Sequence, residues 1–212
     1  MNTSQNSTWT ANHPSGEMTP RERWLAILAG KPTDRIPVDL TATPEVMARL
    51  YRDLNCADEP ALWRKLHVDG RVEVSPRWKL PHHPDDPQGD MWGIRYRRID
   101  YGTGAYEEPD HHPLAKVQSV DEVHRHRWPS ADDFDFSGVT RAVESADGFH
   151  PLHAGWYEPF LFYGYLRGLE AAFEDLIINP EIADAILGHI FDFYYEYHRR
   201  LFEAGKGKID TT

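Results

Sequence analysis

Hydrophobic residues recur at helical spacing in several stretches of the chain. In the clearest stretch, apolar side chains recur every three or four residues from Ile182 to Leu201. Asn179-Pro180 supplies a start signal and Gly205 a stop signal, so we expect one long helix here. The same spacing predicts shorter helices, in chain order, at 20–29, 44–54, around 62–66, just after 119, at 136–146 and at 166–178.

Capping residues support two of these helix starts. Thr19 is followed by Pro20 and, three positions after the threonine, by Glu22, which is the pattern of a capping box with proline in the first turn. Ser119 and Glu122 have the same spacing. We therefore expect helices to begin directly after Thr19 and Ser119.

Short apolar runs between these helices predict strands at 35–40, 70–75 and 150–155, and residues 208–212 resemble the opening of a fourth. Strands that alternate with helices indicate right-handed βαβ units around a parallel sheet. A doubly wound open sheet and a (β/α)₈ barrel both have this pattern. Because a barrel needs ~250 residues, a barrel-forming chain of this length would cover only part of one.

The stretch from 77 to 127 interrupts this alternation. Trp92, Ile94 and Tyr96 alternate with glycine or arginine, and Gly102-Thr103-Gly104 then turns the chain back toward 105–108. This pattern predicts a β-hairpin inserted between two units.

The composition is that of a folded protein with an excess of acid. The 212 residues are 40% hydrophobic and carry 23 Lys and Arg against 34 Asp and Glu, a formal net charge of −11. This charge argues against a nucleic-acid partner. The first 17 residues are polar and are expected to form a disordered tail, which leaves 18–212 as the ordered region.

The chain carries no apolar run of the ~18 residues that a membrane span requires, and its start lacks the apolar core of a secretory signal. We therefore expect a cytoplasmic protein without a membrane partner. Cys56 is the single cysteine, which excludes an internal disulfide and a multi-thiolate metal site.

Several segments, by their order and spacing, carry a resemblance to a known family. They are Met18-Thr19-Pro20-Arg21-Glu22-Arg23 with Asp34-Arg35-Ile36-Pro37-Val38, Asp90-Met91-Trp92-Gly93-Ile94 with His112-Pro113-Leu114, and Leu166-Arg167-Gly168 with Asp175-Leu176 and Asn179-Pro180-Glu181. Together they resemble the uroporphyrinogen decarboxylase superfamily, which includes tetrapyrrole decarboxylases and cobalamin-linked methyltransferases. The resemblance implies an α/β fold in which 18–212 form the N-terminal half of a (β/α)₈ TIM barrel with an inserted β-hairpin.

The decarboxylase branch of this superfamily has two features that the chain lacks. Its Arg-Gln-Ala-Gly-Arg-Tyr segment after the first strand holds substrate carboxylates, and an Asp after the second strand stabilises a cationic intermediate. Here those positions are occupied by Asp39-Leu40-Thr41-Ala42-Thr43-Pro44 and Val74-Ser75-Pro76-Arg77. Without that charge stabilisation, decarboxylation of uroporphyrinogen is not expected, and the methyltransferase branch fits better by elimination.

That branch implies a Zn²⁺ ion bound by His and Cys late in the barrel and a corrinoid partner for a full-length methyltransferase. We expect no metal ligands within these 212 residues. Six of the twelve histidines lie between His82 and His126, but adjacent histidines on an extended segment point in opposite directions and no cysteine lies nearby. Surface histidines are therefore favoured over a metal site.

In a barrel the chemistry sits at the carboxyl ends of the strands, which selects candidate site residues. Glu158 and Tyr157 after the third strand and Asp39 after the first are candidate catalytic residues. Glu158 next to aromatic rings suits an acid or base; alternatively it pairs with Arg167 or caps the following helix. Asp39 either orients substrate or serves as a turn or helix-cap partner of 41–43.

Candidate substrate-binding residues are Trp156, Arg77, Arg167 and Tyr163. The aromatic stretch 156–165 suits a flat wall for a planar macrocycle, and core packing explains it equally well.

The sequence thus predicts part of an enzyme that acts on a small molecule, either a tetrapyrrole or a methyl donor. A non-catalytic fragment or binding module is the alternative. The chain alone is expected to be inactive. Because a partial barrel exposes strand edges and apolar helix faces, we also expect it to be marginally stable, to aggregate or to form homo-oligomers.

Overall fold

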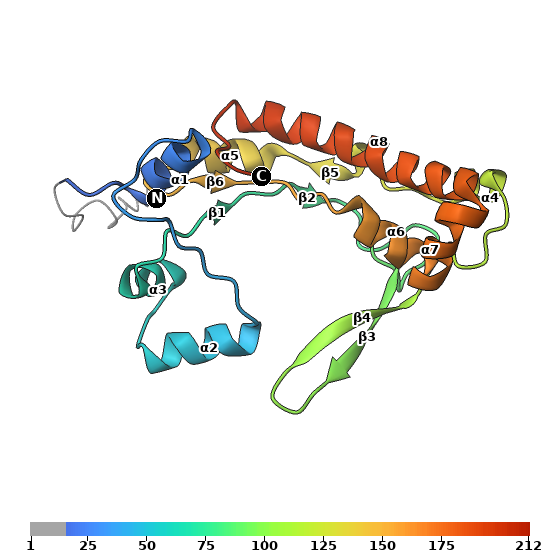
Figure 1. The fold of residues 1–212 in the computed structure, drawn as a ribbon, viewed down its shortest axis with the longest axis horizontal. Coiled ribbons are helices and arrows are strands. Elements are labelled where there is room, and N and C mark those ends of the chain that lie inside the picture. The colour runs from blue at the N-terminus through green and yellow to red at the C-terminus, as the bar shows by residue number, and fades with distance from the viewer. Residues whose placement is uncertain (1–15) are drawn as a thin grey trace. The chain divides into compact units, whose positions relative to one another are not determined.

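The computed structural model describes residues 16–212 (Figure 1). Their contacts divide them into two compact units. Unit 1 contains the chain up to Ser75, Val139–Ala154 and Gly205–Thr212; unit 2 contains Pro76–Gly138 and Gly155–Ala204. Residues 1–15, most of the predicted tail, lie outside the described residues.

The helices of unit 1 lie in the regions where the apolar spacing predicts them. They are α1 (Pro20–Leu28), α2 (Pro44–Asp53), α3 (Glu59–Leu66) and α5 (Ser137–Ser145), whose first two residues belong to unit 2. The capping box of α1 is confirmed: Thr19 Oγ1 accepts from the Glu22 amide at 3.2 Å, and the Glu22 carboxylate accepts from the Thr19 amide at 2.7 Å. The α2 helix begins at Pro44 without a side-chain cap from Thr43.

Four segments of unit 1 lie side by side in chain order. Strand β1 (Val72–Glu73) pairs in parallel with β6 (Leu152–His153), and His153 forms a parallel bridge with Thr211. On the other side, the Asp69 amide donates to the Val38 carbonyl at 2.6 Å. Parallel pairing is therefore confirmed for the second, third and fourth predicted segments, although the strands are only two residues long.

The strand predicted at 35–40 is wrong. Pro37 has no amide hydrogen to donate, and the Val38 amide donates to the Asp69 side chain at 3.0 Å instead of to a neighbouring strand. Ile36 is 77% exposed. The segment therefore runs beside the sheet without forming a strand ladder.

Buried ion pairs hold the start of this sheet. The Asp69 side chain is fully buried and accepts from Arg23 Nη1 at 2.7 Å and from the Arg35 guanidinium. Arg23 also pairs with Asp34 at 2.7 Å, and the Trp24 indole donates to the Asp69 carbonyl. These contacts connect α1 to the first two extended segments.

Unit 2 contains the predicted hairpin, formed by β3 (Arg95–Asp100) and β4 (Ala105–His111), which is confirmed. It also contains a small antiparallel pair that the sequence analysis missed, β2 (Arg77–Trp78) with β5 (Phe134–Asp135). The helices are α4 (Val120–Arg125), the 3-10 helix η2 (Ala131–Asp133), α6 (Pro159–Arg167), α7 (Leu169–Ile178) and α8 (Pro180–Gly205), whose last residue belongs to unit 1.

The long helix at 180–205 is confirmed as α8, but the single helix predicted at 166–178 is wrong. Gly168 has φ +83° and separates α6 from α7. Left-handed φ ends a helix, so the break falls at the glycine and α6 begins earlier, at Pro159.

Aromatic and aliphatic side chains form the core of unit 2. Trp92 is 1% exposed and contacts the rings of Phe162, Phe193 and Tyr194 at centroid distances of 5.1, 5.1 and 5.9 Å. The core joins the loop before the hairpin to α6 and α8.

The fold is thus mixed α/β, with helices and small two-stranded sheets, and residues 16–212 form no closed barrel. None of the helices in the described region is both long and apolar enough to cross a membrane.

Candidate functional site

One face of the parallel sheet of unit 1 carries polar side chains. Because neighbouring residues of a strand point to opposite faces, Glu73 and His153, which are paired in the sheet, share a face, whereas Val74, Leu152 and Ala154 are buried on the other. Contacts add further members to this face. We call the group the sheet-face cluster; it consists of Asp39, Arg71, Glu73, His153 and Thr211.

Arg71 lies at the centre of the sheet-face cluster. Its Nη2 is 2.6 Å and its Nε 2.9 Å from Asp39 Oδ2. Its Nη1 is 3.3 Å from His153 Nδ1, and the guanidinium lies 5.4 Å from the ring centroid of Trp24. The Arg71 and Asp39 side chains are 29% and 30% exposed, so this oriented ion pair remains accessible to a ligand.

His153 links Arg71 to the fourth segment. Its Nδ1 lies 2.9 Å from Thr211 Oγ1, and its Nε2 lies 3.8 Å from the Glu73 carboxylate. Burial, and secondarily the charge of Arg71, lowers the pKa of His153, so the ring is neutral near pH 7. A guanidinium can only donate, so the contact with Arg71 favours a proton on Nε2, facing Glu73.

The cluster therefore presents an imidazole N–H donor, a carboxylate and a fixed guanidinium on one exposed face. A small polar molecule could be hydrogen-bonded and oriented there. Asp39 was the member proposed from sequence. Its side chain also accepts from the Leu40 amide at 2.9 Å, while α2 has Thr43 as its N-cap residue, so Asp39 does not cap that helix.

Sequence reasoning missed Arg71, Glu73, His153 and Thr211. The available signal was position, because each lies in a predicted strand segment that contacts a neighbouring segment of the sheet. Spacing along the sequence does not reveal such neighbours, because they lie 32 to 82 positions apart.

In unit 2, Trp156, Tyr157 and Glu158 form the loop before α6, and all three are exposed. The Trp156 ring lies 5.4 Å from the Phe162 ring, and the Tyr157 ring lies 5.2 Å from the Tyr194 ring. Glu158 occupies the N-cap position of α6 but makes no side-chain cap bond. These three stay candidate site residues on an accessible aromatic loop.

Arg167 and Tyr163 lie in the interior of unit 2. Arg167 donates to Asp175 Oδ2 at 2.6 Å and to the Leu114 carbonyl at 2.7 Å. It does not pair with Glu158, so that alternative for Glu158 is wrong. Tyr163 is fully buried, and burial, followed by the charge of Asp175, raises its pKa to about 12. These contacts join α6 to α7 and to the loop at 114–115.

Arg77, the remaining sequence candidate, lies on β2. Its guanidinium is 3.5 Å from Asp135 of β5, and its side chain is 74% exposed. The contact crosses the small antiparallel pair, and most of the arginine remains available to solvent.

The donor set of residues 16–212 does not fit the His and Cys zinc site that the family resemblance implies. No group of three or more His, Cys, Asp or Glu residues in this region is arranged to hold a metal ion. Cys56 is partly buried, with Sγ 3.6 Å from the Leu54 carbonyl.

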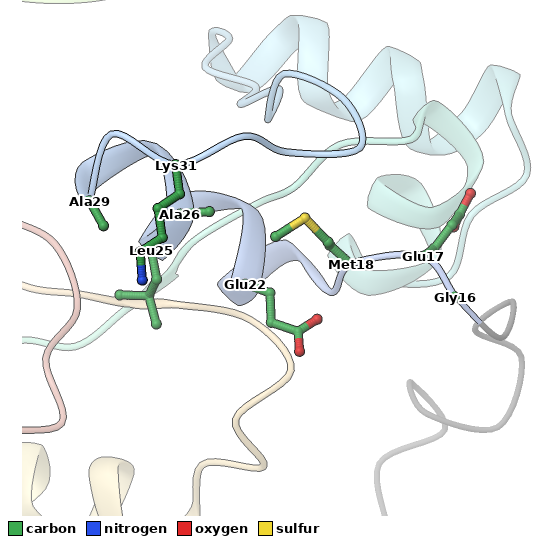
Figure 2. Close-up of a pocket in the computed structure, with 8 residues that line it drawn as sticks. All are labelled: Gly16, Glu17, Met18, Glu22, Leu25, Ala26, Ala29 and Lys31. Carbon is green, nitrogen blue, oxygen red and sulfur yellow. The ribbon is translucent and has the colours of Figure 1, made fainter.

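A separate hollow of about 490 Å³ lies beside α1 (Figure 2). Met18, Leu25 and Ala26 supply apolar lining, and Glu17, Glu22 and Lys31 are its charged members. The Glu22 carboxylate already accepts from Thr19 in the capping box.

Comparison with known proteins gives one structural likeness. No family model and no curated protein matches the chain. The solved structure of a methyltransferase from Methanosarcina mazei superposes with a TM-score of 0.51 at 18% identity, covering 89% of this chain and 57% of that chain. At this identity the likeness shows the fold alone, and the chain spans little more than half the length of that methyltransferase.

Proposed function

We propose that the chain forms the N-terminal half of a (β/α)₈ barrel of the uroporphyrinogen decarboxylase superfamily, and that the complete protein acts in methyl transfer. The observation that carries the proposal is the order of the four segments of unit 1. These segments are 38, 69–74, 152–154 and 210–211, and each lies beside the one that follows it in the chain. The second, third and fourth run parallel to one another. The likeness to a methyltransferase supports it.

This order favours a barrel over a doubly wound sheet. In doubly wound folds the chain reverses direction across the sheet, so that the first strand lies between two later ones (orders such as 3-2-1-4 or 2-1-3-4). Here the second segment contacts the first and the third, and the third contacts the fourth. Such sequential neighbours are expected for successive strands of a barrel.

We assign the sheet-face cluster to the inner, substrate-facing side of that barrel. Arg71, fixed by Asp39, and the Nε2–H of neutral His153 bind and orient a small polar substrate; Glu73 accepts a hydrogen bond from it. For unit 2, taken by itself, Glu158 and Tyr157 are proposed as catalytic groups, and Trp156 and Arg77 as substrate-binding ones.

Methyl transfer is preferred to decarboxylation because of the residues found after the first two extended segments. The Asp and the paired arginines that uroporphyrinogen decarboxylation would need have no counterparts in 39–44 and 74–77. Asp39 is moreover neutralised by Arg71, which leaves no unpaired carboxylate there to stabilise a cationic pyrrole.

The test uses the protein produced from its full coding sequence. It is incubated in parallel with methylcobalamin plus a thiol and with uroporphyrinogen, and methylated thiol and coproporphyrinogen are quantified by chromatography. We expect thiol methylation and no coproporphyrinogen. Coproporphyrinogen formation, or the absence of methylation by the folded protein, would overturn the proposal.

A matched pair of variants tests the assigned site. Arg71→Gln should raise KM or abolish turnover, because the oriented donor is lost. Arg49→Gln, which removes an exposed guanidinium paired with Asp53 on α2, should leave the kinetics unchanged. Equal kinetics of the two variants would show that the sheet-face cluster is not the substrate site.

A further inference from the structure

Two histidines of unit 2 face each other across two helices. His124 lies near the end of α4 and His189 in α8, with His124 Nδ1 only 2.8 Å from His189 Nε2. Their rings are 5.1 Å apart and nearly perpendicular, at 72°. A hydrogen bond between two imidazoles needs one ring nitrogen to donate and the other to accept, so at least one ring is neutral.

The ring of His189 is held in place by its surroundings. It stacks on Trp128 at a centroid distance of 4.5 Å and an interplanar angle of 12°. Trp128 is itself fixed, because its indole N–H donates to the Val123 carbonyl at 3.1 Å. One ligand nitrogen is therefore positioned in advance, whereas His124 is exposed on a short helix and has room to turn.

The surroundings also suit a cation. Burial, followed by the nearby His124, lowers the pKa of His189, so protons compete weakly for its nitrogen near pH 7. The negative charge of Asp192, three residues further along α8, acts on the same ring. Because the histidine pair lies at the surface, water can reach the remaining positions around an ion.

We propose that His124 and His189 form a two-histidine binding site for a divalent transition metal ion that imidazole binds well, such as Cu²⁺ or Ni²⁺. The 2.8 Å between the two ring nitrogens is the distance of their hydrogen bond, so both nitrogens already lie close enough to bind one ion. A rotation of the His124 ring directs both lone pairs at the ion.

Binding would exchange the hydrogen bond for two metal–nitrogen bonds. Water completes the coordination. The site is thus one of two protein nitrogens, which is consistent with the absence of any three-residue metal cluster in residues 16–212. It would connect α4 to α8 and stabilise unit 2 when the ion is bound.

The experiment measures binding of Ni²⁺ alone to the 212-residue chain by calorimetry at pH 7.5. We compare the wild type with His124→Ala and His189→Gln, and use His111→Ala, which removes an exposed histidine of β4, as the control. We expect one Ni²⁺ per chain, at least tenfold weaker binding in the first two variants and no change in the control. Affinity that is equal in all four proteins would overturn the site.

Two readouts separate this site from unspecific histidine binding and from misfolding. The electron paramagnetic resonance spectrum of bound Cu²⁺ should show coupling to two imidazole nitrogens in the wild type and to one in each site variant. Ni²⁺ should raise the Tm of the wild type and of His111→Ala but not that of the exposed-site variant His124→Ala.

Discussion

At the scale of single residues, Asp69 holds the start of the sheet of unit 1. Its fully buried carboxylate accepts from Arg23, from Arg35 and from the Val38 amide. Removing one partner of a buried charge pair leaves the other charge without compensation inside the protein. The cost of breaking this network should therefore be much larger than that of an exposed ion pair.

Asp69→Asn is expected to lower the free energy of unfolding by about 3 kcal/mol, because the amide turns a donor toward the guanidinium groups. Urea denaturation followed by circular dichroism measures the change. The control is Asp53→Asn, which breaks exposed, solvent-screened pairs on α2 and should change the free energy of unfolding far less. Similar losses in the two variants would contradict the role assigned to Asp69.

His126 gives the stability of unit 2 a dependence on pH. Burial is the main cause that lowers its pKa to about 4, while its Nε2 donates to the Trp92 carbonyl at 3.1 Å. In the unfolded chain a histidine has a pKa of about 6.5. Below that pH the unfolded state takes up a proton that the folded state does not, so stability falls as pH falls from about 6.5 toward about 4.

His126→Gln removes this titration and keeps a side-chain donor near the Trp92 carbonyl. Urea midpoints at pH 7 and pH 4.5 should therefore differ less for the variant than for the wild type. His111→Gln, at an exposed position of β4, should retain the wild-type difference. An unchanged pH dependence in His126→Gln would show that another group is responsible.

At the scale of elements, Gly155 determines how the aromatic loop approaches α8. It has φ +91°, and a Cβ atom at this position would lie 2.8 Å from His198 Nε2. Any other residue would be strained in its backbone and would also push the imidazole away. The position of Tyr157, which contacts Tyr194 and His198, depends on this close approach.

Gly155→Ala should destabilise the protein by about 2 kcal/mol, with backbone strain and the contact both contributing. Gly102→Ala is the matched control: its φ is +88°, but nothing lies within 4 Å of an added Cβ. It should cost only the backbone part, about 1 kcal/mol. Thermal unfolding measures the loss of stability in each variant. Equal losses in the two variants would mean that the His198 side chain moves away from the added Cβ without cost.

The elements that the sequence predicted correctly are those specified by local signals. The 3.6-residue period and the proline and glycine at its ends specify α8, and Gly102-Thr103-Gly104 specifies the hairpin. The segment 35–40 was mispredicted because a distant side chain, Asp69, takes the Val38 amide. Whether a distant side chain competes for a backbone amide depends on the tertiary fold, so the sequence of the segment alone does not predict it.

In the candidate site, too, the sequence predicted only the residues that a local signal marks. Asp39 could be found because it follows an apolar run. Arg71 and His153 could not, because their proximity depends on which segments become neighbours in the sheet. For Arg167 the sequence supplied the residue, but its buried partner Asp175 is revealed only when α6 and α7 pack together.

At the scale of the whole molecule, apolar side chains remain exposed on one face of α7. Positions 169, 173, 176 and 177 share a helical face, and their exposed fractions are 60%, 54%, 44% and 85%. A contiguous apolar surface of this kind is typical of a protein interaction site. It supports the expectation that the 212-residue chain associates with itself.

Sedimentation velocity over a range of concentrations tests this expectation. The wild-type chain should show concentration-dependent association, and Ile177→Lys should shift it toward monomer because a charge interrupts the apolar face. Ile36→Lys is the matched control, since Ile36 is an exposed isoleucine of unit 1, 77% accessible, outside α7. Association should persist in this variant. A wild-type chain that stays monomeric at every concentration, or equal association of both variants, would show that the α7 face does not mediate self-association.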